Sequence, residues 1–322
     1  MLTSRDIGGL MAMMPAFATD TAASLSATDT VSVERLRAGL DRMVRDGADV
    51  IATTGSFGEC HTLLHEEFAT LARECVDVVK KRVPLFVGVT SVNAREAVAR
   101  MRIVADTSAD GVLLGVPYYF PSTVDNAVRF YREIAELFPK LNILIYHNPA
   151  LHHVTLPVEC FEALVKIPQI VGMKDSHRDT TTFLRLQEII RGKISVMVNA
   201  IQYIPYAQMG AAGLWSIDAW MGPWPLFALR DAVKRGDLKA AQTIILELTG
   251  PTRAMNLSWR ETAAKLAIAM AGYVEPGPLR PPFLDIPADV IEAQKKRVEK
   301  WQRLCAKYSP AYEGAGKQVA AE

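Results

Sequence analysis

The chain has 322 residues, enough for one large domain or two ordinary ones, and half of them are hydrophobic. Its 36 basic and 35 acidic side chains nearly balance, so no overall field attracts nucleic acid or an anionic membrane. The four cysteines form no CxxC pair, which argues against common zinc and redox motifs and favours a reducing compartment, here the cytoplasm.

An apolar stretch near the start, "GLMAMMPAFA", predicts a first strand rather than a secretory segment. Arg5 is followed directly by Asp6, so the stretch has no cationic flank, and a proline interrupts it. No apolar run reaches the roughly 20 residues that a membrane helix needs. We therefore expect no membrane partner.

Eight short apolar runs, most of them rich in β-branched residues, follow one another along the chain. They cover residues 9–15, 49–54, 84–89, 111–116, 142–147, 169–174, 193–198 and 212–217. Helical periodicity lies between them: Leu36, Leu40 and Met43 fall on one face of a predicted helix that Gly47 ends.

Strands that are apolar on both faces and alternate with helices indicate parallel βαβ units. Eight such units in about 220 residues predict an α/β fold of the (β/α)8 TIM-barrel type over residues 1–222. After residue 222 the strand signal stops, and residues 223–322 are expected to form a helical extension packed on the barrel.

The carboxyl ends of barrel strands are where an active site is expected, and two of the predicted strands end in reactive residues. Lys174 closes the sixth strand, with its side chain either in the barrel mouth or on the outside. A lysine amine between apolar walls is a nucleophile towards carbonyls, whereas on a solvated rim it pairs with Asp175 or Asp179. Tyr146 closes the neighbouring fifth strand and is suited to moving protons beside such an amine; alternatively it is a core tyrosine.

The loop "TTGSFGEC" after the second strand offers two glycines and the Ser56 hydroxyl. Its backbone N–H groups and this hydroxyl are suited to holding a small carboxylate. As a bare pattern the signal is weak, because glycine-rich turns are common after barrel strands.

Four short motifs in this order resemble one family. "GSFGE", "PYY", "YHNP" and "GMKD" follow the second, fourth, fifth and sixth strands, as in the pyruvate-dependent class I aldolases, which include dihydrodipicolinate synthase and N-acetylneuraminate lyase. The resemblance runs from about residue 9 to the end of the chain. It implies a homotetrameric TIM barrel that needs neither a metal nor another cofactor, because the substrate forms a covalent imine.

The resemblance also implies roles for individual residues. Lys174 forms the imine with pyruvate, Tyr146 relays protons, and Ser56 with the Phe57 backbone amide binds the pyruvate carboxylate. Tyr119 matches a tyrosine that the synthase donates across a subunit interface to its proton relay. Phe57 departs from the family, because a second hydroxyl residue is usual there.

A further departure argues against dihydrodipicolinate synthesis. The synthase has an arginine where this chain has Leu151, and an apolar side chain cannot grip a carboxylate. "SFGECHTL", "GLWSIDAW" and "AGYVEPGPLRPPF" resemble instead the hydratase-aldolases of aromatic-hydrocarbon breakdown, which convert a benzylidenepyruvate and water to an aromatic aldehyde and pyruvate. In that setting Trp215 is expected to be a wall for the substrate ring, or else a core residue at the rim.

One residue, Arg260, predicts the ring substituent. Arg260 stands where the resemblance implies an asparagine in the hydroxybenzylidenepyruvate enzymes, and a guanidinium is suited to a carboxylate. The expected substrate is therefore trans-2'-carboxybenzalpyruvate, cleaved to 2-carboxybenzaldehyde. The alternatives are trans-o-hydroxybenzylidenepyruvate, giving salicylaldehyde, or the substrate of another pyruvate aldolase, with Arg260 as an exposed helical residue. His61 either reaches the substrate or packs structurally.

Two other classes of protein remain as alternatives. Six histidines raise the possibility of a metal-dependent barrel enzyme, although no HxH pair stands at a strand end. A barrel that only senses a sugar or amino acid is the second alternative. The presence of both Lys174 and Tyr146 argues against it.

Overall fold

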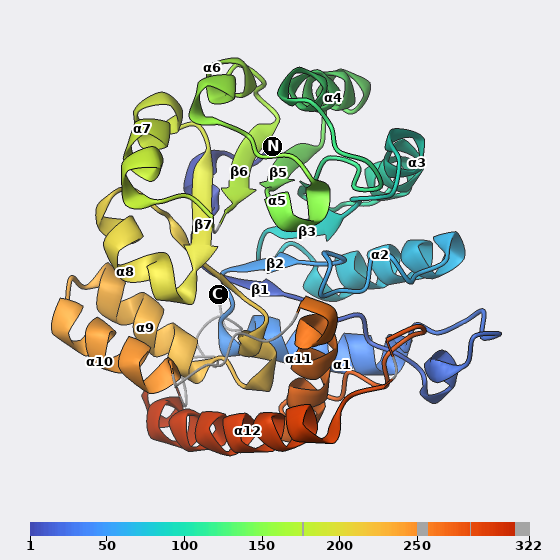
Figure 1. Ribbon diagram of the computed structural model, residues 1–322, viewed down its shortest axis with the longest axis vertical. Helices are drawn as coiled ribbons and strands as arrows, with labels where there is room; N and C mark the ends of the chain where they lie inside the picture. Colours follow the sequence, from blue (N-terminus) through green and yellow to red (C-terminus); the bar gives the residue numbers. More distant parts are fainter. Residues whose placement is uncertain (176, 250–256, 284, 313–322) are drawn as a thin grey trace.

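The protein is described by a computed structural model that covers residues 1–175, 177–249, 257–283 and 285–312, without the side chains of residues 257–261. Eight parallel strands form a closed barrel, each paired with its neighbours in sequence and the last with the first (Figure 1). The strands are β1 (Gly9–Met13), β2 (Val50–Ala52), β3 (Leu85–Gly88), β4 (Gly111–Leu114), β5 (Asn142–Tyr146), β6 (Ile170–Lys174), β7 (Ser195–Asn199) and β8 (Gly213–Ser216). The predicted TIM barrel is confirmed.

Helices surround the barrel and continue beyond its last strand (Figure 1). They are α1 (Val33–Asp46), α2 (His65–Val79), α3 (Ala94–Ala105), α4 (Val124–Leu137), α5 (Pro149–His152), α6 (Phe161–Leu164), α7 (Thr180–Ile190), α8 (Ala200–Gln208), α9 (Trp224–Lys234), α10 (Leu238–Leu248), α11 (Leu257–Ala271) and α12 (Ala288–Tyr308). Helix α1 shows how the sequence sets the two ends of a helix. The Ser32 hydroxyl caps its start, and Gly47 at φ +109° ends it.

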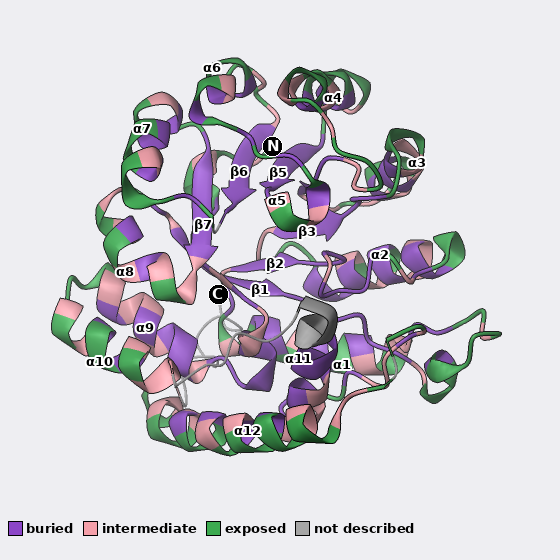
Figure 2. Cartoon of the chain, viewed as in Figure 1, coloured by how far each residue is buried: buried purple, intermediate pink, exposed green. Residues whose placement is uncertain are grey.

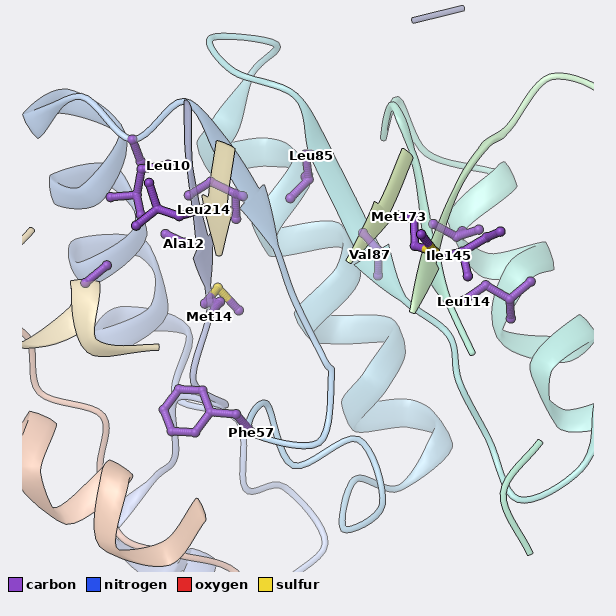
Figure 3. Packing of buried hydrophobic residues seen from close by; sticks show 14 of the residues in the cluster. Leu10, Ala12, Met14, Phe57, Leu85, Val87, Leu114, Ile145, Met173 and Leu214 are labelled. Carbon is purple, nitrogen blue, oxygen red and sulfur yellow. The ribbon is translucent and has the colours of Figure 1, made fainter. Parts of the chain in front are cut away.

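The strands are buried on both faces, as their apolar runs predict (Figure 2). In β1, Met11 and Met13 belong to a cluster inside the barrel, whereas Leu10 and Ala12 belong to the larger cluster between strands and helices. Figure 3 shows part of that larger cluster, in which Phe57 joins from the loop after β2. A loop that carries predicted site residues is thus anchored in the core.

The helical extension packs on the barrel through α9, α11 and α12. The Trp301 indole of α12 donates to the Gly222 carbonyl at 3.0 Å, just after the last strand. Within the extension, α9 and α10 are separate helices, because Gly236 takes a positive φ of +74° between them. The division of the chain at residue 222 stays a prediction.

Among the described helices, none combines the length and the apolar character that a membrane crossing requires.

A one-residue irregularity in the pairing of β5 with β6 determines which way the last side chains of β6 point. Ile143 pairs with Ile170, but the next residue, Leu144, pairs with Gly172, so β6 has one extra residue. Beyond this shift Tyr146 pairs with Lys174. Because Tyr146 belongs to the interior cluster, the shift places both residues on the inner face.

Barrel closure allows a test at Gly213 in β8, which pairs with Gly9 in β1. A Cβ at residue 213 would lie 2.1 Å from the Gly9 carbonyl oxygen and 2.6 Å from its amide nitrogen. Backbone must then move, so Gly213→Ala should lower the free energy of unfolding by about 1–3 kcal/mol, measured by urea denaturation.

Gly172→Ala is the matched control in β6. Its new Cβ would meet the end of the Ile7 side chain at 3.2 Å, and a flexible side chain moves more easily than backbone. A larger loss for Gly172→Ala than for Gly213→Ala would contradict the closure argument.

Candidate active site

Lys174 is almost fully buried, with an exposed fraction of 5%, and its amine lies between two aromatic rings. Its Nζ is 3.5 Å from the ring centroid of Trp215 and 4.7 Å from that of Tyr146. The Trp215 indole N–H in turn donates to the Asp175 carbonyl at 3.4 Å. The amine thus closes a strand inside the barrel, in surroundings that are mainly aromatic, rather than on a solvated rim.

The Tyr146 hydroxyl is the meeting point of a small hydrogen-bond chain. It lies 2.8 Å from the Ser56 hydroxyl, and the Asn148 side-chain amide donates to it at 3.3 Å. Three elements therefore converge here: the loop after β2, the end of β5 and the start of α5. A phenol linked to a second hydroxyl is well placed to pass a proton towards an imine at Lys174.

A cavity of about 260 Å³ lies beside the hydrogen-bonded Ser56 and Tyr146 side chains. Its inner wall, from the barrel mouth, includes Ser56, Phe57, Thr90, Tyr146 and His152. Tyr146 belongs both to this wall and to the aromatic surroundings of the Lys174 amine, so it links the cavity to the nucleophile.

The outer wall of the cavity comes largely from the helical extension. Leu279 and Phe283 lie there, and the His61 ring packs edge-on against Phe283 with centroids 5.2 Å apart. Thr262 and Lys265 of α11 complete this side. A ring-shaped, mostly apolar substrate portion suits such a wall.

Lys265 belongs to a buried ionic network that ties the extension to the barrel loops. Its ammonium donates to Glu59 at 2.5 Å, to the Ala16 carbonyl at 2.9 Å and to the Pro278 carbonyl at 2.7 Å. Arg280 donates to the other Glu59 oxygen at 3.1 Å. Burial lowers the pKa of Lys265 to about 8, although the Glu59 carboxylate opposes that shift. All three ammonium protons are used, so the group holds structure rather than offering a bond to a ligand.

A second buried network stands directly behind the two strand ends. Asp175 accepts hydrogen bonds from His147 at 3.1 Å and His177 at 2.8 Å, and Arg178 binds its other oxygen. Burial raises the pKa of Asp175, but these hydrogen bonds and the Arg178 charge hold it well below its usual range. The Leu156 amide donates to His147 Nε2, so its Nδ1 carries the proton.

The same three ligand-type side chains, His147, Asp175 and His177, place their ligand atoms within 4.8 Å of one another. A divalent cation here would have to displace the buried Arg178 guanidinium from the carboxylate or share the carboxylate with it. His147 also has both ring nitrogens in hydrogen bonds. The geometry fits a hydrogen-bonded ion cluster better than a metal site.

The structure brings together some of the predicted site residues and separates others. Lys174, Tyr146 and Ser56 converge, and Phe57 and His61 line the cavity. Their roles stay predictions.

Tyr119 is 72% exposed and packs against Phe120, while its neighbour Tyr118 lines the cavity. Trp215 lies against the Lys174 amine rather than in the cavity wall. The Arg260 side chain lies outside the described residues. The proton-relay role of Tyr119 and the substrate contacts of Trp215 and Arg260 remain predictions.

Two residues at the cavity gave no usable signal in the sequence. His152 was one of six scattered histidines, and only the fold turns it towards Tyr146, with ring centroids 4.9 Å apart. Lys265 sits in a helix whose pattern gives no reason to expect a buried charge, and its partner Glu59 is 206 positions away.

The family model described as "Dihydrodipicolinate synthetase family" matches residues 14–301. The chain belongs to this family. A trans-O-hydroxybenzylidenepyruvate hydratase-aldolase of Sphingobium xenophagum is 32% identical over 314 residues, which are 93% of this chain and 95% of the relative. A trans-2'-carboxybenzalpyruvate hydratase-aldolase of Nocardioides sp. (strain KP7) is 27% identical over 95% of this chain and 96% of the relative.

Among solved structures, "PhdJ bound to substrate intermediate" superposes with a TM-score of 0.90 at 29% identity, covering 95% of this chain and 99% of that one. The family and these relatives show that the protein is a lyase of the aldolase type.

The buried network at Glu59 yields a stability test. Glu59→Gln would leave Lys265 and Arg280 as two buried cations without their shared carboxylate. Removing one partner from a buried ion network costs about 3–5 kcal/mol, so the free energy of unfolding should fall by that much.

Lys265→Met is the control, because Arg280 still neutralises Glu59 in that variant. It should lose less stability than Glu59→Gln in the same urea titration. An equal or larger loss for Lys265→Met would mean that Glu59 is not the centre of the network.

Proposed function

We propose that this chain is a class I hydratase-aldolase. It would convert a substituted benzylidenepyruvate and water to an aromatic aldehyde and pyruvate. The observation that carries the proposal is the pairing of Lys174 with Tyr146 at the barrel mouth, beside an apolar cavity with aromatic side chains in its wall. The hydratase-aldolase relatives support the same reaction class.

In this reaction the Lys174 amine condenses with the substrate ketone. The resulting iminium withdraws electrons, so the conjugated double bond accepts water, and retro-aldol cleavage then leaves the enamine of pyruvate on the same nitrogen. Tyr146, linked to Ser56, moves protons on and off the intermediates. Ser56 and the Phe57 amide hold the pyruvate carboxylate.

The ring portion would occupy the outer part of the cavity, near His61 and Phe283. Two observations favour an ortho-hydroxyl over the carboxylate expected from Arg260. The hydroxybenzylidenepyruvate relatives reach 30–32% identity against 27% for the carboxybenzalpyruvate relative. Moreover, Lys265 in the described wall has its three protons engaged, so it offers a ring carboxylate no free donor.

We further propose a cytoplasmic homotetramer in which Tyr119 completes a neighbouring subunit's proton relay. Tyr119 and Phe120 are 72% and 74% exposed and stack on each other, which suits a subunit contact.

The imine is tested by reductive trapping. Borohydride with pyruvate should inactivate the protein and add mass at Lys174, as located by peptide mass spectrometry, because reduction makes the imine permanent. Lys174→Met should form no adduct, whereas Lys265→Met should still form it. An adduct at another lysine, or none in the wild-type protein, would contradict the proposal.

The ring substituent is tested by comparing turnover of the 2'-hydroxy- and 2'-carboxybenzylidenepyruvates, followed by loss of near-UV absorbance. We expect the higher kcat/KM for the hydroxylated substrate, by about tenfold, since a buried carboxylate is poorly solvated and Lys265 in the described wall has no free donor for it. Arg260→Asn should then affect both substrates alike. A higher kcat/KM for the carboxylated substrate, lost selectively in Arg260→Asn, would restore the carboxylate assignment.

A further inference from the structure

His152, at the end of α5, is a buried titratable group beside the candidate nucleophile that the reaction as described above does not use. It lines the cavity, with an exposed fraction of 4%. Its imidazole stands edge-on to the Tyr146 ring, with centroids 4.9 Å apart and planes at 89°. The imidazole therefore borders the cavity next to Tyr146, whose ring also lies 4.7 Å from the Lys174 amine.

The His152 imidazole packs against the backbone of Gly115 so closely that a side chain at residue 115 would have no space. A Cβ built on Gly115, just after β4, would lie 2.2 Å from Cε1 of the imidazole and within 2.8 Å of both ring nitrogens. The His152 amide also donates to the Asn148 carbonyl at 2.8 Å, which fixes the first turn of α5. The imidazole is thus seated against bare backbone rather than free to swing.

His152 is neutral in the free protein. Burial lowers its pKa to about 3, and electrostatic interactions with His147 and Lys174 contribute to that shift. An interaction with the Tyr146 backbone opposes it, as a carbonyl that accepts from a ring N–H would do. A neutral imidazole that donates one N–H to backbone keeps an acceptor on its other nitrogen, and His152 lines the cavity, where water can reach such an acceptor.

We propose that His152 is a further catalytic residue, which binds the water that adds to the substrate double bond and accepts its proton. This inference rests on the proposed hydratase-aldolase function and assigns a residue to its hydration step. Lys174 and Tyr146 keep the imine and cleavage steps.

The step balances within the site. The water oxygen bonds to the benzylic carbon of the iminium-linked substrate while one water proton moves to the acceptor nitrogen of His152. The double-bond electrons shift to the imine nitrogen and form an enamine. His152 then returns the proton to the carbon next to the former carbonyl, and the iminium is restored. Water has been added, and no oxidant, reductant or further reactant is required.

Charge movement makes a weakly basic imidazole suitable for this role. The positive charge at the Lys174 nitrogen repels a proton on His152, but that charge disappears while the enamine exists. Proton uptake by His152 therefore coincides with loss of the cation that disfavours it, and the net charge of the site stays constant. Desolvation continues to disfavour the imidazolium, which promotes rapid return of the proton.

The test separates hydration from cleavage with two probes. Benzylidenepyruvate requires both steps, whereas 4-hydroxy-2-oxo-4-phenylbutanoate, the hydrated adduct, requires cleavage alone; release of benzaldehyde is measured for each. His152→Phe keeps a planar ring against Tyr146 but has no nitrogen. Its kcat should fall by about a hundredfold or more with benzylidenepyruvate and change little with the adduct.

Gly115→Ala tests the same proposal without removing the imidazole. Its Cβ displaces the ring, so it should show the same selective loss. His153→Asn is the matched control: His153 is the exposed neighbour of His152 and has a φ of +53°, which asparagine tolerates. It should leave both reactions unchanged.

Equal losses with both probes in His152→Phe, or no loss with either, would overturn the assignment, because the residue would then support the pocket generally or not at all. Failure of the proposed function looks different. In that case the wild-type protein would convert neither probe, whatever residue stands at position 152.

Discussion

The extra residue that β6 inserts opposite β5 decides where the reactive groups of this barrel lie. Without the shift after Ile143, the side chains of the following residues of β6 would exchange faces. With it, the Lys174 amine stands inside the barrel against the Trp215 and Tyr146 rings. The quadrupole of an aromatic ring attracts a cation at its face, but aromatic rings offer far fewer hydrogen bonds than water does. Such surroundings suit an amine that becomes a cationic iminium and then a neutral enamine.

Two buried ionic networks keep this arrangement in place from opposite sides. Behind the strands, Asp175 binds Arg178 and two histidines, immediately after Lys174 in the chain. At the cavity's outer edge, Glu59 holds Lys265 and Arg280 of the extension. Burying such charges is costly, but separating any one partner is costlier, so each network fixes its segments in one relative position. The extension thereby becomes part of the cavity wall rather than an appendage.

Periodicity was sufficient to predict the eight strands, because a strand buried on both faces has an almost continuous apolar run. Lys174 and Tyr146 were predictable as well, since each ends such a run. The sequence could not predict whether Lys174 points into the barrel or outwards, because a one-residue shift in strand pairing leaves no mark in composition. Nor was the seat of His152 predictable: it depends on Gly115, which lacks a side chain and lies more than thirty positions earlier. Long-range pairs such as Glu59 and Lys265 likewise follow from the fold alone.

The division of the cavity wall would let one barrel support both steps of the proposed reaction, hydration and cleavage. The groups proposed to handle protons lie on the inner side near the strand ends; they are Ser56, Tyr146 and His152. The outer side, with Leu279 and Phe283, is mainly apolar and comes from the extension. A substrate with a keto acid at one end and an aromatic ring at the other matches this polarity in only one orientation. In the proposed reaction, that orientation would direct the ketone towards Lys174 and the benzylic carbon towards His152. Because the outer wall belongs to a separate segment of chain, it can change with the ring while the strand ends retain their chemistry.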